Sequence, residues 1–320
     1  MDTKTAVDCQ TLLSQVRNLG DLSPVEQKVL RALTRGEWAV CGSTDDDKDP
    51  NNDPSKADQS WGSERTVRAK FIRWLCVNPV AKECVDPMGV IIYGAKIIGT
   101  LNLSFVNTFP LFFYRCSFAE DAIFRSARVP FLSFQGSWVR EITADGIDIE
   151  GEAYLNDGFH AKGTVFFINA KIGGNLVCDG GSFANGLAAD AIEIKGDASL
   201  RRGFRAAGEV RLLGAQVAGN LDCDCSSFTN LSRYSLKADG ISVKGSVLVR
   251  QSVNEGEMRL LNADIGGNLE CDGSSFKNRA GPALSADGMS VRGSVFLRHG
   301  FHSEGEVRLT GTANWRAAGL

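Results

Sequence analysis

The chain has 320 residues, 43% of them apolar, and a formal net charge of −3, which is ample for the core of one large domain or two. Its nine cysteines show no disulfide-framework spacing, and its longest apolar run, Phe109–Tyr114, is far too short to span a bilayer. No signal peptide is recognisable either. These features exclude a disulfide-stapled secreted protein, and we expect a cytoplasmic protein without a membrane segment.

Residues 1–88 are predicted to form a helical region that differs from the rest of the chain. Ser23 is a candidate N-cap, Pro24 stands at the first helical position, and Glu26 follows three residues after the cap. This pattern predicts a helix that begins at Pro24. A second helix is predicted over 64–76, and we expect its apolar face to cap the open end of the domain that follows.

An acidic segment separates these two predicted helices. Residues 44–59 read "TDDDKDPNNDPSKADQ" and contain almost no apolar side chains. Such a segment buries too little apolar surface to offset the entropy of ordering. We therefore predict a flexible acidic loop.

From residue 89 to 320 one long unit recurs. The units begin "ADGIDIEG", "ADAIEIKG", "ADGISVKG" and "ADGMSVRG", at Ala144, Ala189, Ala238 and Ala286. Their successive offsets are 45, 49 and 48 residues. Repetition at a fixed period of this length is the signature of a solenoid.

Within a unit, apolar residues recur at steps near five. The positions are Leu212, Val217, Cys223 and Phe228, and in the next unit Leu260, Ile265, Cys271 and Phe276. Neither a helix nor an alternating strand gives this spacing, but a square coil with one inward side chain per side does. Four sides make a turn of about 24 residues, so each unit spans two turns stacked as parallel strands about 4.8 Å apart. We predict an all-β, right-handed parallel β-helix of about eight or nine turns.

This pattern resembles a known group of repeat proteins. Small residues stand two positions before inward ones, as Ala215 does before Val217, which is similar to the pentapeptide-repeat proteins and their right-handed quadrilateral β-helices. The segments "GVIIYGAKIIGTLNL" and "GGNLxCDG" more closely resemble bacterial β-helical proteins labelled membrane-associated oxidoreductases. The resemblance covers roughly Arg65 to Gly311 and departs from a strict pentapeptide pattern in its six-residue steps.

The oxidoreductase label requires a cofactor site, and the sequence shows no motif for one. There is no G-x-G-x-x-G after a strand, no P-loop and no C-x-x-C, so we expect no cofactor, no metal and no catalytic residue. The repeated cysteines are predicted to be small core residues, and the repeated asparagines a ladder of amides at the corners. These are Cys178, Cys223 and Cys271, and Asn175, Asn220 and Asn268.

Three columns of cations are the candidate interaction residues. They are Arg211, Arg259 and Arg308; Lys195, Lys244 and Arg292; and Arg201, Arg250 and Arg298. Cations at intervals of ~10 Å would match a phosphate backbone, so nucleic-acid or nucleotide binding is one alternative. It is not favoured, because residues 90–320 carry 24 acidic and 23 basic residues and glutamates that precede the first column predict pairing within the face. These glutamates are Glu209, Glu257 and Glu306.

The features together favour a non-catalytic scaffold or protein-interaction module. We expect a protein partner, and we expect the C-terminal end either to pair with a second copy as a homodimer or to dock another protein. A second alternative is an enzyme of the β-helix lyase or hydrolase type, which would gather carboxylates in a side groove.

Overall fold

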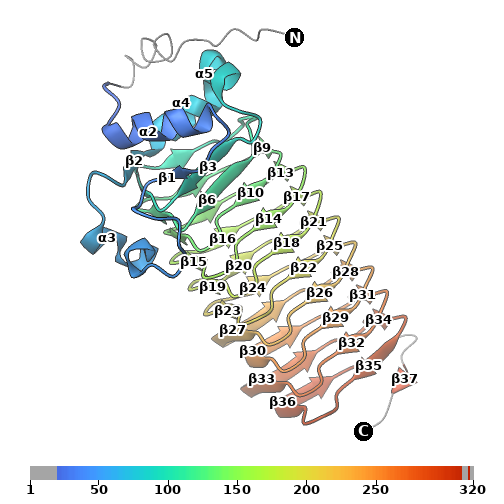
Figure 1. The fold of residues 1–320 in the computed structure, drawn as a ribbon. Helices are drawn as coiled ribbons and strands as arrows, with labels where there is room; N and C mark the ends of the chain where they lie inside the picture. The colour runs from blue at the N-terminus through green and yellow to red at the C-terminus, as the bar shows by residue number, and fades with distance from the viewer. Residues whose placement is uncertain (1–19, 312–315, 318–320) are drawn as a thin grey trace.

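A computed structural model describes residues 20–311 and 316–317 of the chain. Between residues 90 and 308 the chain forms a parallel β-solenoid of about 10 turns, with a few short helices at its N-terminal end (Figure 1). The prediction of a mostly β, parallel solenoid with a small N-terminal helical region is confirmed. The expected eight or nine turns were too few.

Each turn of the solenoid has four short sides. One turn consists of β13 (Asp148–Ile149), β14 (Ala153–Tyr154), β15 (His160–Ala161) and β16 (Val165–Phe166). The next strand, β17 (Lys171–Ile172), pairs in parallel with β13 and begins the following turn. Ile172 and Val217 lie in register two turns apart, with Ile194 between them, so each repeated unit spans two turns as predicted.

Stacking of the turns produces three parallel sheets, which we name sheets A, B and C. Sheet A contains β1 (Ala39–Val40), β3 (Val90–Tyr93), β6 (Leu111–Tyr114), β10 (Leu132–Ser133), β14, β18 (Leu176–Val177), β22 (Ala198–Ser199), β26 (Leu221–Asp222), β29 (Val247–Leu248), β32 (Leu269–Glu270), β35 (Ser294–Phe296) and β37 (Arg316–Ala317). Sheet C contains β9 (Arg128–Val129), β13, β17, β21 (Glu193–Ile194), β25 (Gln216–Val217), β28 (Ser242–Val243), β31 (Asp264–Ile265) and β34 (Ser290–Val291).

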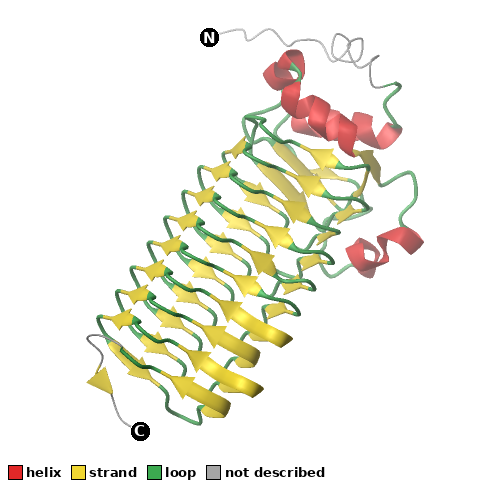
Figure 2. Cartoon of the chain, turned by 180° about the vertical axis from the view of Figure 1, so that it is seen from behind, coloured by secondary structure: helices red, strands yellow, loops and turns green. Residues whose placement is uncertain are grey.

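Sheet B supplies the two remaining sides of each turn. Its strands are β2 (Thr66–Arg68), β4 (Lys96–Ile98), β5 (Leu101–Asn102), β7 (Ser117–Phe118), β8 (Ala122–Ile123), β11 (Trp138–Val139), β12 (Ile142–Thr143), β15, β16, β19 (Ser182–Phe183), β20 (Leu187–Ala188), β23 (Arg205–Ala206), β24 (Val210–Arg211), β27 (Ser227–Lys237), β30 (Val253–Arg259), β33 (Ser275–Ser285) and β36 (His302–Arg308). In the last four strands the two sides merge into one long strand, whose broad ribbons are seen at the lower end of Figure 2.

The corners explain the many glycines of the sequence. Asn169 and Gly180 turn corners of one coil with φ values of 55° and 66°, in the left-handed region that favours Gly and Asn. Gly173 stands at a corner where an added Cβ would lie 2.0 Å from the carbonyl oxygen of Glu150 in the adjacent turn. At these corners, glycine is therefore either favoured by the backbone conformation or required by the close approach of the adjacent turn.

Apolar columns fill the interior of the solenoid. The rings of Phe159, Phe183, Phe204 and Phe228 lie one above another, with neighbouring centroids 5.0–5.5 Å apart. Identical or similar side chains stack in this way because parallel, in-register turns place equivalent positions next to each other.

The repeated cysteines and asparagines occupy the places predicted for them. Cys178, Cys223 and Cys271 are fully buried, and burial raises the pKa of each of these free thiols. At the corners, Asn220 accepts a hydrogen bond from the Ser246 backbone N–H at 2.8 Å. Asn175 and Asn268 accept equivalent bonds from the next turn, so the predicted role of these amides at the corners is confirmed. The amides do not contact one another, because Asp197 and Ser246 occupy the same corner in the intervening turns.

Helices cover the N-terminal end of the solenoid, as seen in Figure 2. They are α2 (Pro24–Leu33), α4 (Ala69–Val77) and α5 (Pro79–Cys84). The helix α2 starts with the predicted capping box: Ser23 Oγ accepts from the Glu26 N–H at 3.2 Å, and the Glu26 carboxylate accepts from the Ser23 N–H at 3.0 Å. The helix α4 buries Phe71 and Leu75 in the same core as the solenoid, as expected of a cap.

Two predictions for this region were wrong. The helix predicted over 64–76 begins only at Ala69, because Thr66–Arg68 forms β2, which pairs with β4 and starts the solenoid.

Much of the predicted flexible loop at 44–59 instead forms short helices, from residue 50 onward. These are two 3₁₀ helices, Pro50–Asn52 and Pro54–Lys56, and α3 (Ala57–Ser60). Asn52 is fully buried, donates to the carbonyl oxygens of Thr44 and Asp46, and accepts from Arg65 Nη1 at 3.0 Å. Polar side chains thus order this segment by forming hydrogen bonds to its backbone. The low apolar content of the segment does not predict such contacts.

Candidate functional site

The cations Arg201, Arg250 and Arg298 lie on the outer face of sheet A, where each follows a strand. Arg201 forms ion pairs with Asp179 at 3.0 Å and Asp222 at 3.1 Å. Arg201 therefore bridges a carboxylate of the preceding turn and one of the following turn, and its hydrogen bond to Asp179 raises the pKa of the guanidinium.

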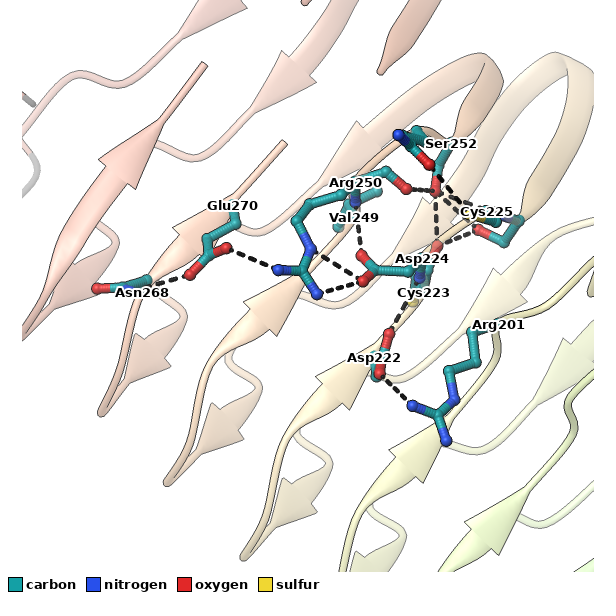
Figure 3. A network of polar contacts seen from close by, with 12 residues as sticks. Arg201, Asp222, Cys223, Asp224, Cys225, Val249, Arg250, Ser252, Asn268 and Glu270 are labelled. Carbon is teal, nitrogen blue, oxygen red and sulfur yellow. Dashed lines mark hydrogen bonds and ion pairs between the residues drawn. The ribbon is translucent and has the colours of Figure 1, made fainter. Parts of the chain in front are cut away.

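Arg250 repeats this arrangement, and Arg298 repeats the pair with the preceding turn. Arg250 pairs with Asp224 at 2.5 Å and with Glu270 at 3.3 Å (Figure 3). Arg298 pairs with Asp272 at 2.9 Å, and this bond lowers the pKa of the carboxyl. We name these alternating residues the Asp–Arg ladder: Asp179, Arg201, Asp224, Arg250, Asp272 and Arg298.

Alternation of charge accounts for a repeat of two turns. Neighbouring strands lie about 4.8 Å apart, so the same charge on every turn would place like charges directly opposite each other, which is destabilising. In the ladder an aspartate occupies one turn and an arginine the next, as Asp224 and Arg250 do. The aspartate is the residue after each repeated cysteine, so one strand end directs a thiol inward and a carboxylate outward.

Ion pairs also occupy the column of Arg211, Arg259 and Arg308. Their partners are Asp190 at 2.7 Å, Asp239 at 2.9 Å and Asp287 at 2.6 Å. These are the aspartates of the Ala-Asp pairs that open each unit, and they also accept backbone N–H groups of the next turn. Pairing within the face was expected, but the predicted partners were wrong: the aspartates, not Glu209, Glu257 and Glu306, neutralise this column.

Only the third column is open. Lys195, Lys244 and Arg292 are exposed at the end of alternate strands of sheet C. Lys195 lies 3.7 Å from Glu193, whereas Lys244 and Arg292 form no ion pair with any residue that the structure describes. The structure thus separates the nine candidate cations into six with close ion pairs and three that are largely free.

Sequence reasoning did not find the cavity where the segment after α2 meets the outer face of sheet A. The cavity has a volume of about 470 Å³. Its solenoid side is formed by Tyr93 and Tyr114, which end β3 and β6, and by Arg115, Gly136 and Asp157. The last three are corner residues with positive φ, so they mark the same corner in successive turns.

Trp38, Asp45 and Asp47 form the opposite wall of this cavity. The Trp38 indole stacks on the Tyr114 ring at 4.9 Å with an interplanar angle of 6°, and Trp38 remains 50% exposed. The aromatic row continues along sheet A from Tyr114 to Phe112 and Phe131, with centroids 6.0 and 5.1 Å apart. We name this site the aromatic–acidic cavity.

Hydrogen bonds hold two of its three carboxylates in place. Asp47 pairs with Arg115 at 3.3 Å and accepts from the Tyr93 hydroxyl at 3.0 Å, and burial together with this contact raises the pKa of Tyr93 to about 12. Asp157 accepts from Gln135 Nε2 at 2.9 Å. Asp45 is exposed and has no hydrogen-bond or ion-pair partner among the described residues.

One sequence signal pointed to this site. In "LFFYR", Phe112 and Tyr114 alternate with Leu111 and Phe113, and only the latter pair is fully buried. A strand with aromatic residues on its outer face needs a covering or a ligand for them. The residues that supply the opposite wall are distant in sequence, so the pattern by itself could not identify the cavity.

The cysteine pair Cys223 and Cys225 points in two directions. Cys223 is buried in the core, whereas Cys225 is exposed at a corner with a φ of 54°. The two thiols therefore cannot bind the same ion.

Comparison of the chain with protein-family models, curated proteins and solved structures finds no match. Among residues 20–311 and 316–317, no helix has the length and apolar character needed to cross a bilayer.

Proposed function

We propose that this chain is a non-catalytic scaffold that binds a protein partner. The observation that supports this most directly is the aromatic–acidic cavity, which opens to the surface beside a half-exposed indole, Trp38. Exposed aromatic residues in a preformed polar cavity are typical of protein-binding sites. The interior columns are packed with side chains, so the solenoid serves as a rigid support for its surfaces.

A binding role is favoured over a lyase or hydrolase role by the contacts of the carboxylates. Asp47 faces a guanidinium and a hydroxyl donor, and Asp157 faces an amide donor, so each of these two carboxylates is already held by a donor of the chain. These contacts suit electrostatic recognition of a ligand.

The resemblance to pentapeptide-repeat proteins, and to the β-helical group labelled membrane-associated oxidoreductases, supports the same proposal. Solenoids of this kind present long repeated surfaces to partners. The oxidoreductase label adds no cofactor, because the sequence shows no motif that would hold one.

Self-association is the second part of the proposal. The strand β36 (His302–Arg308) pairs with β33 on one side, and no strand of the described residues pairs with its other edge. A seven-residue strand edge without a partner strand among the described residues can serve as a template for pairing with another chain. Light scattering at two protein concentrations and at low and high salt should show a dimer, and a monomer throughout would remove this part of the proposal.

In-cell photo-cross-linking tests partner binding. A benzophenone side chain would replace Asp46, which is exposed beside the cavity. In two matched controls it would replace Gln216 on sheet C or Lys162, directly after β15 of sheet B; both residues are also exposed. We expect a discrete heteromeric cross-link from position 46 in the cells that make the protein. Absence of a discrete product from all three positions would overturn the proposal.

A further inference from the structure

We propose that the aromatic–acidic cavity binds an arginine side chain presented by the protein partner. This inference rests on the proposed function and specifies the chemistry of the partner. It follows from three features of the cavity: a half-exposed indole, an excess of negative charge and a fixed geometry.

The half-exposed indole is that of Trp38, which lines the cavity. One side of its indole covers the Tyr114 ring at 4.9 Å, and half of the residue is exposed to solvent. A guanidinium that stacks on an indole gains both cation–π attraction and flat contact, and Trp is the most favourable ring for this interaction. The Tyr114 ring stacks on the indole and holds it in position, so the aromatic surface is formed before a ligand binds.

The charge of the cavity favours a cation. Three carboxylates line it, those of Asp45, Asp47 and Asp157, against the single guanidinium of Arg115. Arg115 is already paired with Asp47. The carboxylates of Asp45 and Asp157 therefore have no cationic partner among the described residues, and a bound guanidinium would supply one.

Arginine fits this arrangement better than lysine or a sugar. Its planar fork can stack on Trp38 and direct N–H groups at carboxylate oxygens at the same time. A lysine ammonium is a compact, strongly hydrated charge that cannot do both as well. A neutral saccharide would stack on the ring, but it would leave the negative charge of the cavity uncompensated.

The walls of the cavity are held by backbone contacts. The strand β1, which lies between Trp38 and Cys41, pairs with β3 and holds the backbone that directly follows Trp38. Arg115 Nη2 also donates to the carbonyl oxygen of Asp47, which ties the acidic wall to the solenoid corner. A preformed site of this kind loses little entropy when it binds a side chain.

The test uses the full chain and a defined probe, the peptide acetyl-Gly-Arg-Gly-amide. Its citrulline analogue is the matched control, because citrulline keeps the shape of the side chain and removes its charge. Binding is followed by the shift of the Trp38 indole N–H resonance in ¹⁵N-labelled protein, assigned with Trp38→Phe. We expect saturable binding of the arginine peptide and binding of the citrulline peptide that is weaker by about tenfold.

Two variants and a control complete the test. Trp38→Ala and Asp45→Asn should each weaken arginine binding by about three- to tenfold, as read from the peptide's own resonances. Asp58→Asn removes a charge from the same acidic segment but outside the cavity, at a residue that pairs with Lys96, and should leave binding unchanged. Circular dichroism verifies that each variant is folded.

The outcomes separate this inference from the proposed function. Equal binding of the citrulline or lysine peptide, or binding of methyl glucoside instead, would overturn the assignment to arginine. If no peptide binds but cross-links from position 46 still form, the scaffold proposal stands and the arginine inference fails. If neither is observed, both fail.

Discussion

At the scale of single residues, one buried side chain departs from its column. Asn254 lies in register between Phe228 and Phe276 in the interior of the solenoid. It is fully buried, and its amide oxygen and nitrogen have no hydrogen-bond partner among the described residues. A buried polar group left unpaired costs about 1–3 kcal/mol. Asn254 is thus a weak point of the core.

Replacement of Asn254 by leucine, which has a similar size, is expected to stabilise the protein by about 1 kcal/mol, because it removes an unpaired amide. The urea midpoint of unfolding, followed by circular dichroism, measures the change. Asn268→Leu is the matched control: Asn268 accepts from the Ser294 N–H and donates to Glu270, so its loss should lower the midpoint. A lower midpoint for Asn254→Leu would show that the buried amide is satisfied in solution.

At the scale of elements, a buried carboxylate connects α2 to the first strand of the solenoid. Glu26 accepts from Arg68 Nε at 2.7 Å and from the Arg68 and Ser23 backbone N–H groups at 3.1 and 3.0 Å. Burial tends to raise the pKa of Glu26, but these bonds outweigh it and hold the pKa below the ordinary value of 4.5. The same residue thus completes the capping box and fixes the helix in place.

Glu26→Gln should therefore have a pH-dependent effect. A lowered folded-state pKa means that the carboxylate stabilises the fold above the ordinary value of 4.5, and that this contribution is lost as the pH falls through the folded pKa. We expect the free energy of unfolding, measured with urea, to fall by about 1–3 kcal/mol at pH 7 and to differ less from that of the wild type near pH 3. Glu37→Gln, at an exposed position just after α2, should change little. A constant difference at all pH values would contradict the role of the charge.

The Asp–Arg ladder makes a second prediction at this scale. Arg250→Glu would place a carboxylate between Asp224 and Glu270, so both ion pairs are lost and like charges face each other. Because the Arg250 side chain is 43% exposed, solvent screening limits the decrease in the free energy of unfolding to about 1–2 kcal/mol. Arg292→Glu makes the same charge change at a cation that has no ion pair among the described residues, and it should leave the free energy of unfolding nearly unchanged. Equal effects of the two variants would show that the ladder contributes nothing specific.

At the scale of the whole molecule, internal pairing of charge bears on nucleic-acid binding. Six of the nine candidate cations have close carboxylate partners on their own face, and only the column of Lys195, Lys244 and Arg292 remains largely free. Affinity for a phosphate backbone comes from cations that release bound counterions, and paired arginines release few.

We therefore expect no binding of duplex DNA at physiological salt, measured by fluorescence anisotropy. If binding is found at low salt, a variant with Glu in place of Lys195, Lys244 and Arg292 should lose it. A variant with Glu in place of Arg211, Arg259 and Arg308 should keep it, because these arginines already pair with aspartates. Strong DNA binding that is abolished only by the Glu variant of the Arg211 column would contradict this account.

The sequence determined the architecture of this protein. Steps of five and six between apolar residues and a 45–49-residue unit were sufficient to predict a parallel coil with two turns per unit. They sufficed because each turn contacts only its neighbours, so local periodicity specifies the packing. The capping box of α2 was predictable for the same reason, since its two partners lie three residues apart.

Only the tertiary structure decided which charges pair and where a cavity opens. Arg211 prefers Asp190, in the preceding turn, to Glu209 two residues away, because a pair across neighbouring turns depends on corner geometry that sequence spacing does not specify. Likewise, the acidic segment is ordered by its contacts with Arg65, and Trp38 reaches Tyr114 only when β1 pairs with β3. Such contacts join residues far apart in the chain, and their geometry exists only once the solenoid has formed.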